Sequence, residues 1–250
     1  SESSGRSLNG AIPISRKERF AIALGVTAIY SLYHPLAIFT QDLPYWAPIT
    51  FVDTAVPLSP LWMYPYAFVF FVAFVPAAII NERELFIRMA LSYLCVQLTA
   101  FTLFILMPVR MTLRPEWVEV NSFETWALQL CYMADKPVNC CPSLHVALAF
   151  LGALATRTVD RFVGNLGLII ALIISLSTMF VKQHLLFDVL LGLLISGLSF
   201  KLIVVPFKPE ITVGVERRNG RKRGLIMLAV YSFVLIGFYF SYLAGWVPWA

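Results

Sequence analysis

The sequence predicts an all-α membrane protein, a polytopic bundle of transmembrane helices. Of its 250 residues, 59% are hydrophobic and only 13% are charged, and the mean hydropathy is +0.78. Both composition and hydropathy lie outside the usual range of soluble globular domains. The apolar residues also gather into runs of about 20, the helix length that crosses the hydrocarbon core of a bilayer. Because hydrocarbon offers no hydrogen bonds to the backbone, such runs are expected to be helices.

Six of these runs are long enough to span the membrane, and a seventh, shorter one would span only if it were extended or tilted. No linker or repeat divides the chain, so we expect one transmembrane domain over residues 16–250. The polar residues 1–15 are expected to be a disordered tail or an expression remnant outside the fold. In chain order the runs cover about residues 19–40, 61–80, 86–107, 143–158 (the short one), 163–182, 185–205 and 225–247.

The distribution of basic residues predicts the topology. They are concentrated before the first run, after the second, after the fourth, and between the sixth and seventh, and these four places share one side. By the positive-inside rule that side, with the N-terminus, is cytoplasmic. The loops 41–60, 108–142 and 182–185 then face the periplasm, the extracellular space or an organelle lumen. The net charge of +5 is therefore explained by topology and anionic lipid, and we expect no nucleic-acid partner.

The outer loop 108–142 is longer than a connection between spans requires. A short amphipathic helix at about 122–133 is predicted within it. We expect this helix to lie along the outer membrane interface and to border the entrance for a lipid substrate. If the loop faces an oxidising compartment, Cys131 could form a disulfide with Cys140 or Cys141.

Two of the three histidines in the chain lie beside the ends of apolar runs. His184 and Asp188 are four residues apart, so a helix would place them on one face, where the carboxylate can hold the imidazole in one tautomer. The predicted topology brings His145 to the same outer depth. Ionisable residues are costly in an apolar surrounding unless they pair or face a watery cavity, so this cluster is a candidate functional site.

The few basic residues of the outer side lie next to these histidines and indicate an anionic substrate. Arg110 and Arg114 suit phosphate oxygens, and Lys182 precedes His184 by two residues. Ser143 can donate a hydroxyl at a helix start, which also offers free amides and a positive dipole end. Phosphoryl transfer needs mainly such positioning and charge neutralisation. No Asp/Glu cluster suggests Mg²⁺, so we expect no metal and no cofactor.

Within this site His184 is the expected nucleophile. It alone has a carboxylate partner at the fourth following residue, Asp188, and attack on phosphorus would form a phosphohistidine. His145 would protonate the leaving oxygen and then activate water or an alcohol. Chemistry alone leaves the reverse assignment of the two histidines open.

Short motifs around these residues resemble those of the type 2 phosphatidic acid phosphatase (PAP2) superfamily, over about residues 60–205. The resemblance implies a six-helix core, to which the run at about 225–247 adds one further span. It also implies that the second-motif histidine is the acid or base, that the third-motif histidine is the nucleophile, and that arginine and serine hold phosphate. The matching motifs are Arg114-Pro115 for the first, Pro142-Ser143-Leu144-His145 for the second, and Ser177 with His184 and Asp188 for the third.

Two positions depart from the family pattern. Met107 stands where the first motif usually opens with lysine, and Thr178 where the third usually has arginine. Arg110 and Lys182 are plausible replacements because each lies within a few residues of the vacant position. The resulting pattern is similar to the branch that holds inositol phosphorylceramide synthases.

The sequence thus predicts a lipid-phosphate phosphatase that acts outside the cytoplasm through a phosphohistidine. One alternative is a phosphotransferase that moves a phosphorylated headgroup onto a lipid alcohol. A non-enzymatic lipid-binding or transport protein is an alternative of another class. The lipid and the oligomeric state are left open.

Overall fold

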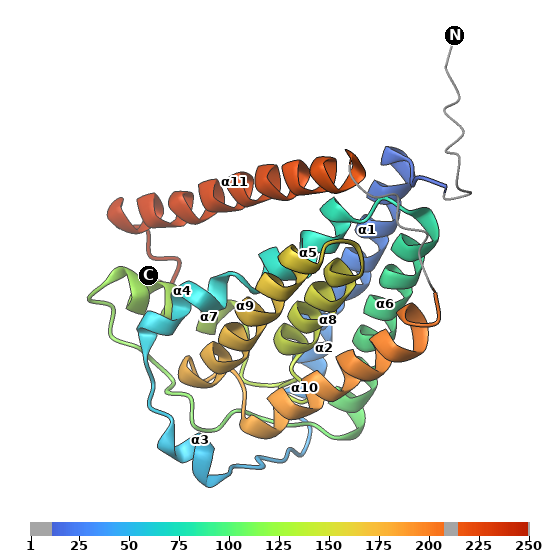
Figure 1. Ribbon diagram of the computed structural model, residues 1–250. Helices are drawn as coiled ribbons and strands as arrows, with labels where there is room; N and C mark the ends of the chain where they lie inside the picture. Colours follow the sequence, from blue (N-terminus) through green and yellow to red (C-terminus); the bar gives the residue numbers. More distant parts are fainter. Residues whose placement is uncertain (1–11, 208–214, 250) are drawn as a thin grey trace.

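The computed structural model describes residues 12–207 and 215–249, and all regular elements in these ranges are helices (Figure 1). The predicted all-α class is therefore confirmed. The elements are α1 (Arg16–Ser31), α2 (Tyr33–Thr40), α3 (Phe51–Ala55), η1 (Pro60–Trp62), α4 (Met63–Ala67), α5 (Val69–Ile79), α6 (Arg83–Leu106), α7 (Phe123–Ala134), α8 (Leu144–Val159), α9 (Arg161–Phe180), α10 (Leu186–Ser199), the π-helical η2 (Phe200–Val204) and α11 (Val215–Leu243).

Six helical stretches within the described residues are long and apolar enough to cross a membrane, which confirms the six predicted spans. The protein is accordingly an integral, multi-pass membrane protein. The first stretch is not one straight helix, because α1 ends at Ser31 and α2 begins at Tyr33. Pro35 explains the break, since a proline within a helix has no N–H and clashes with the carbonyl four residues earlier. The six stretches are Arg16–Thr40, Pro60–Ile79, Arg83–Leu106, Arg161–Phe180, Leu186–Val204 and Asn219–Leu243.

The helix of the short run, α8, is the centre of the bundle. It contacts α5, α6, α9 and α10, and ten of its sixteen residues are buried. Small residues allow its neighbours to come close: a Cβ on Gly152 would lie 2.6 Å from the Val72 carbonyl oxygen of α5. A helix surrounded by other helices need not match the bilayer thickness, which explains how α8 can be shorter than the rest.

Basic residues gather at one end of the bundle. Arg83 pairs with Glu18 at 2.6 Å and Arg221 with Asp160 at 2.6 Å. This arrangement agrees with the expected grouping of the basic loops, while the side of the membrane on which they lie stays a prediction.

Residues 12–15, at the end of the expected tail, are among the residues that the structure describes. Residues 1–11 lie outside the described residues. Ile14, however, is buried, and its N–H donates to the Asn81 carbonyl at 2.8 Å. Apolar burial against the α5–α6 turn thus draws the last residues of the expected tail into the fold.

The last helix, α11, runs along α5 and α4 toward α7 (Figure 1). Gly220 lies against Ile79 at the basic end, and the Tyr231 ring lies against Phe68 and Phe71. Beyond the helix, the Trp246 carbonyl accepts a hydrogen bond of 2.8 Å from the Trp126 indole of α7. The predicted span at about 225–247 therefore packs along α5 and reaches α7.

The helix predicted at about 122–133 is confirmed as α7. A capping box starts it, in which the Ser122 hydroxyl accepts from the Thr125 N–H and the Thr125 hydroxyl accepts from the Ser122 N–H. The predicted place of this helix along the membrane interface and beside a substrate entrance remains a prediction. Cys131, Cys140 and Cys141 all carry free thiols, so neither disulfide considered from the sequence is formed.

Candidate active site

The turn between α9 and α10 holds the His184 backbone in place. The Thr178 carbonyl of α9 accepts hydrogen bonds from the N–H groups of Gln183 at 2.8 Å and His184 at 3.1 Å. Lys182 in this turn has a φ of 51°, a left-handed conformation that is uncommon for a residue with a side chain. His184 thus lies in a tight turn that precedes α10 and not within the helix.

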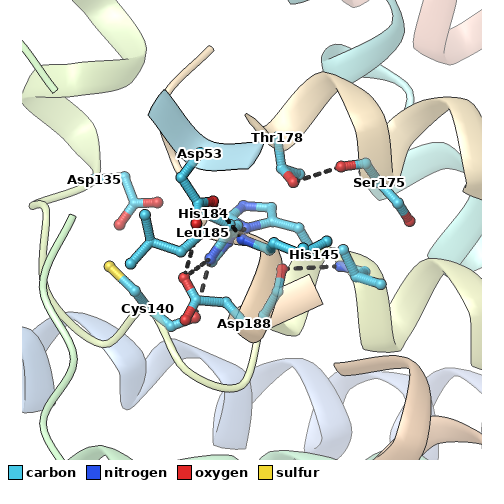
Figure 2. A network of polar contacts seen from close by, with 12 residues as sticks. Asp53, Asp135, Cys140, His145, Ser175, Thr178, His184, Leu185 and Asp188 are labelled. Carbon is cyan, nitrogen blue, oxygen red and sulfur yellow. Dashed lines mark hydrogen bonds and ion pairs between the residues drawn. The ribbon is translucent and has the colours of Figure 1, made fainter. Parts of the chain in front are cut away.

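Asp188 meets His184 as the sequence predicts, but by a different local structure. Its Oδ2 accepts the Leu185 N–H at 2.8 Å and so caps the start of α10. The same oxygen lies 3.6 Å from Nδ1 of His184. The carboxylate therefore comes near the imidazole because Asp188 caps the helix that follows His184, and not because both residues lie on one helix face. Figure 2 shows His184 between Asp188, Asp53 and His145.

Close packing of α8 against α10 brings the second histidine to this turn. The Ser143 N–H donates to the Asp188 carbonyl at 3.0 Å, and the Ser143 hydroxyl caps α8 by accepting the Val146 N–H at 3.2 Å. A Cβ on Gly192 would lie only 2.7 Å from the Ser143 carbonyl oxygen. Glycine at this position is what allows α8 and α10 to approach so closely.

A chain of hydrogen bonds joins the two imidazoles and fixes their tautomers. His184 Nδ1 lies 3.0 Å from the Cys140 carbonyl oxygen, which can only accept, so this nitrogen carries the proton. In neutral His184, Nε2 then holds a lone pair, and it lies 3.0 Å from Nδ1 of His145. His145 therefore donates from Nδ1, which leaves its Nε2 as the acceptor. The Tyr66 hydroxyl lies 3.0 Å from that atom and donates to it.

Tyr66, on α4, was not predicted from the sequence as a site residue. Its side chain is 6% exposed, and its hydroxyl completes the chain that ends at the Cys140 carbonyl. In the sequence it is only one of the two tyrosines in Tyr64-Pro65-Tyr66, near the start of the second run. Its contact with His145 is tertiary and could not have been inferred from spacing.

Asp53, on α3, was also missed. Oδ1 accepts the Leu186 N–H at 2.7 Å, and Oδ2 accepts the N–H and hydroxyl of Thr50 at 2.7 and 2.6 Å. The carboxylate therefore ties the loop 41–60 to the first turn of α10. The pattern Thr50-x-x-Asp53 is a capping-box signature, so the contact of Asp53 with Thr50 could be predicted from the sequence. The contact with Leu186 could not.

A third carboxylate, Asp135, lies at the end of α7 on the other side of His184 (Figure 2). Its Oδ1 accepts the Tyr33 hydroxyl at 2.7 Å. Burial raises the pKa of the Asp135 carboxyl above its ordinary value, although the Tyr33 hydroxyl and the charges of His184 and Arg114 act in the opposite direction. Asp135 is thus within electrostatic reach of the His184 imidazole.

Lys182 is the predicted cation whose position is best defined. Its side chain is 7% exposed, and Nζ donates to the carbonyls of Asp53 at 2.9 Å and Val56 at 2.6 Å. Burial lowers the pKa of the amine. Lys182, His184 and Asp53 line one small gap between α3 and α10. An ammonium group has three N–H donors, so one remains besides the two that hold these carbonyls.

The two arginines hold main-chain carbonyls within residues 41–60 and 108–142. Arg114 donates to the carbonyls of Asp135, at 2.7 Å, and Tyr132, with its guanidinium 3.8 Å from the centre of the Tyr132 ring. Burial lowers the pKa of Arg114. Arg110 donates to the Gln41 carbonyl and lies 4.2 Å from the centre of the Tyr45 ring. Neither side chain contacts a histidine of the site.

Ser177 is fully buried in α9, and its hydroxyl donates to the Ile174 carbonyl at 2.6 Å. Thr178, where the resemblance places an arginine, likewise donates to the Ser175 carbonyl at 2.8 Å. The phosphate-binding roles predicted for Ser177, Ser143, Lys182 and the two arginines remain predictions. No group of three or more His, Cys, Asp or Glu suited to a metal ion occurs among residues 12–207 and 215–249.

The fold and this site define a multi-pass membrane protein in which two hydrogen-bonded histidines lie beside a buried carboxylate. The profile of the PAP2 superfamily matches residues 44–202. Because this match covers more than half of the 250 residues, the chain belongs to the PAP2 superfamily. The match begins before the predicted core at about residue 60 and includes α3 with Asp53. No significant match was found among curated proteins or among solved structures.

Membership indicates phosphatase or phosphotransferase activity of the kind that is typically metal-independent. The match is to the superfamily as a whole and does not single out the branch of inositol phosphorylceramide synthases.

Proposed function

We propose that this protein removes the phosphoryl group of a membrane lipid phosphate at the extracytoplasmic face, through a phosphohistidine on His184. One observation carries the proposal: the Cys140 carbonyl holds the proton of His184 on Nδ1, which leaves the lone pair of Nε2 directed at His145. A neutral imidazole with a free, oriented nitrogen is a nucleophile.

In the proposed reaction the phosphoryl group lies between the two imidazoles. His184 Nε2 attacks phosphorus, and the bond from phosphorus to the lipid oxygen breaks. With the anionic phosphate bound, His145 acts as an imidazolium, and its Nδ1 proton passes to that oxygen, which leaves as a lipid alcohol while the imidazole becomes neutral. His145 then takes a proton from water as the water attacks phosphorus, and the N–P bond breaks to release phosphate. Since the two nitrogens are 3.0 Å apart, the rings must separate to admit the phosphoryl group.

Charge on the reacting group would be neutralised from several directions. Lys182 lines the gap beside His184, and the first turn of α8 offers amide N–H groups and a positive dipole end beside His145. As His184 becomes cationic on attack, Asp188 at 3.6 Å stabilises it. We assign Ser143, Arg114 and Ser177 to phosphate binding as the family motifs suggest, and Arg110 to the same role as the replacement for the first-motif lysine.

A lipid alcohol instead of water as the acceptor is the second candidate. His145 lines an apolar groove among the helices, and this supports an acceptor with an alkyl chain as well as a leaving lipid. In that case His145 takes its proton from the alcohol, and the product is a new phosphorylated lipid. Similarity to the inositol phosphorylceramide synthase branch favours the same candidate.

One experiment tests both. Purified protein in lipid nanodiscs is incubated with a panel of lipid phosphates in EDTA, with and without lipid alcohols, and both free phosphate and lipid products are measured. Phosphate release that persists in EDTA is expected, and a new lipid that forms only with an added alcohol would favour the transferase. No turnover across the panel would contradict the proposal and favour lipid binding or transport.

A further inference from the structure

An open apolar groove leads from His145 into the membrane-spanning part of the bundle. Four helices form it: α1, α5, α6 and α8. Its walls are almost entirely aliphatic or aromatic, with Val26 of α1, Phe70 and Phe74 of α5, and Leu148 of α8 among the residues that line it. His145 is at the same time a wall residue of the groove and a member of the hydrogen-bond chain. The groove is therefore continuous with the reacting groups.

One polar side chain on the wall of this groove has an unmet hydrogen-bonding group. Gln97 of α6 is 1% exposed, and its Oε1 is buried without a hydrogen-bond partner. Two other polar groups of the wall are already bonded within the protein: the Thr27 hydroxyl donates to the Ala23 carbonyl and the Tyr93 hydroxyl to the Ala73 carbonyl. A buried acceptor without a donor is unfavourable, and more so in an apolar surrounding.

We propose that this groove binds the alkyl chain of the lipid substrate and that Gln97 accepts a hydrogen bond from a hydroxyl or amide N–H on the lipid, close to its phosphate. The inference rests on the proposed function, because it takes the phosphate of that lipid to lie at His184. It adds a requirement on the lipid: a donor next to the headgroup. A phosphorylated prenyl or simple alkyl chain lacks such a donor and leaves Oε1 unpaired.

Two sources share this chemistry. The donor can be the free hydroxyl of a glycerol-type lipid or the amide N–H of a sphingoid-type lipid. In both, the alkyl chain fills the apolar walls while the donor meets Gln97. The residue would then discriminate between classes of lipid without touching the phosphoryl group.

Binding of non-hydrolysable analogues tests the inference without any need for turnover. The probes are radiolabelled hexadecylphosphonate and analogues with a hydroxyl or an acetamido group on the second, third or fourth carbon. We expect at least one donor-bearing analogue to bind the full-length protein in detergent micelles about tenfold more tightly than hexadecylphosphonate, the effect of one unmet hydrogen bond. The series that gains affinity identifies the hydroxyl or the amide.

Gln97→Leu is expected to remove this tenfold gain and to leave the affinity for hexadecylphosphonate unchanged. Thr102→Val is the matched control, because Thr102 is an exposed α6 residue whose hydroxyl donates to Leu98 and not to the groove. If Gln97→Leu does not fold, Gln97→Met serves, and the comparison of analogues on the wild type still decides.

Equal affinity of the wild type for all analogues would overturn the inference, as would an equal loss for every analogue in Gln97→Leu. A donor preference in a protein that turns over no lipid phosphate would instead refute the proposed function and leave the groove assignment standing.

Discussion

Removal of the Tyr66 hydroxyl is the perturbation that most sharply tests the hydrogen-bond chain. In Tyr66→Phe the ring still fills its place, but Nε2 of His145 loses its donor at 3.0 Å. The buried nitrogen is then either unpaired or protonated itself. A neutral imidazole has one N–H, so a ring with its proton on Nε2 has none on Nδ1, the atom that faces His184. His145 would then have no proton to donate on the side of the reacting phosphoryl group.

The cost follows from the energy of one buried hydrogen bond. Leaving a buried acceptor unpaired costs about 1–3 kcal/mol, and if that cost appears in the barrier, turnover falls by about tenfold to a hundredfold. The assay is the initial rate of phosphate release from a lipid phosphate, with the unfolding midpoint measured in parallel. The expected result is a large fall in kcat with a nearly unchanged midpoint.

Tyr64→Phe is the matched control. Tyr64 lies two residues earlier on the same helix, is 50% exposed, and donates at 2.6 Å to Glu124, away from the histidines. Its loss is expected to change the rate less than twofold, an estimate from the small worth of exposed polar contacts. Equal rates in the two variants would refute the reasoning about the tautomer of His145.

Three further predictions concern the support of the site. Gly192→Ala places a Cβ against the Ser143 carbonyl, so we expect a loss of about 1–3 kcal/mol in the free energy of unfolding and slower turnover; a wild-type rate would mean that α8 and α10 need not be so close. Asp53→Ala removes the acceptor of the Leu186 N–H and is expected to increase proteolysis of the loop 41–60 and reduce turnover at least tenfold; unchanged proteolysis and rate would show that this tie is dispensable. The pKa of Asp135 is raised in the folded protein, so its carboxyl binds a proton more tightly there than in the unfolded chain. The stability that this proton binding provides is present at low pH and is lost as pH rises from the unfolded pKa of about 3.9 through the folded pKa. Asp135→Asn is therefore expected to unfold at a higher temperature than wild type at pH near 7 and not at pH near 3, where both side chains are neutral; the opposite order at neutral pH would contradict the assignment.

The helical fold could be predicted because a membrane imposes it. Length and hydropathy of a run suffice to indicate a span, and all six long spans agree with the structure. The arrangement of the spans is a matter of tertiary packing, and hydropathy carries no information on it. The central place of α8 depends on close contacts such as that of Gly152 with Val72, which no periodicity reveals. The burial of Ile14 could not be predicted for the same reason.

The reacting residues were predictable to the extent that their chemistry is local. His184 and Asp188 are neighbours in sequence, and the resemblance of the second motif pointed to His145. Tyr66 and Asp53 contact the site from segments far away in sequence, so only the structure could assign them. For the predicted cations, charge and position in the sequence were enough to select Arg110 and Arg114. The sequence did not reveal that their guanidinium groups donate to main-chain carbonyls.

The central claim is that His184 carries the phosphoryl group, and trapping of the covalent intermediate tests it directly. The protein is mixed with a lipid phosphate labelled with radioactive phosphorus, quenched at alkaline pH where phosphohistidine survives, and the labelled peptide is mapped. His34→Asn is the matched control, because His34 is the third histidine of the chain and is exposed on α2. Label on the peptide that contains His184, kept in His34→Asn and lost in His184→Asn, is the predicted result. Label that persists in His184→Asn, or that maps to His145 in the wild type, would contradict the account.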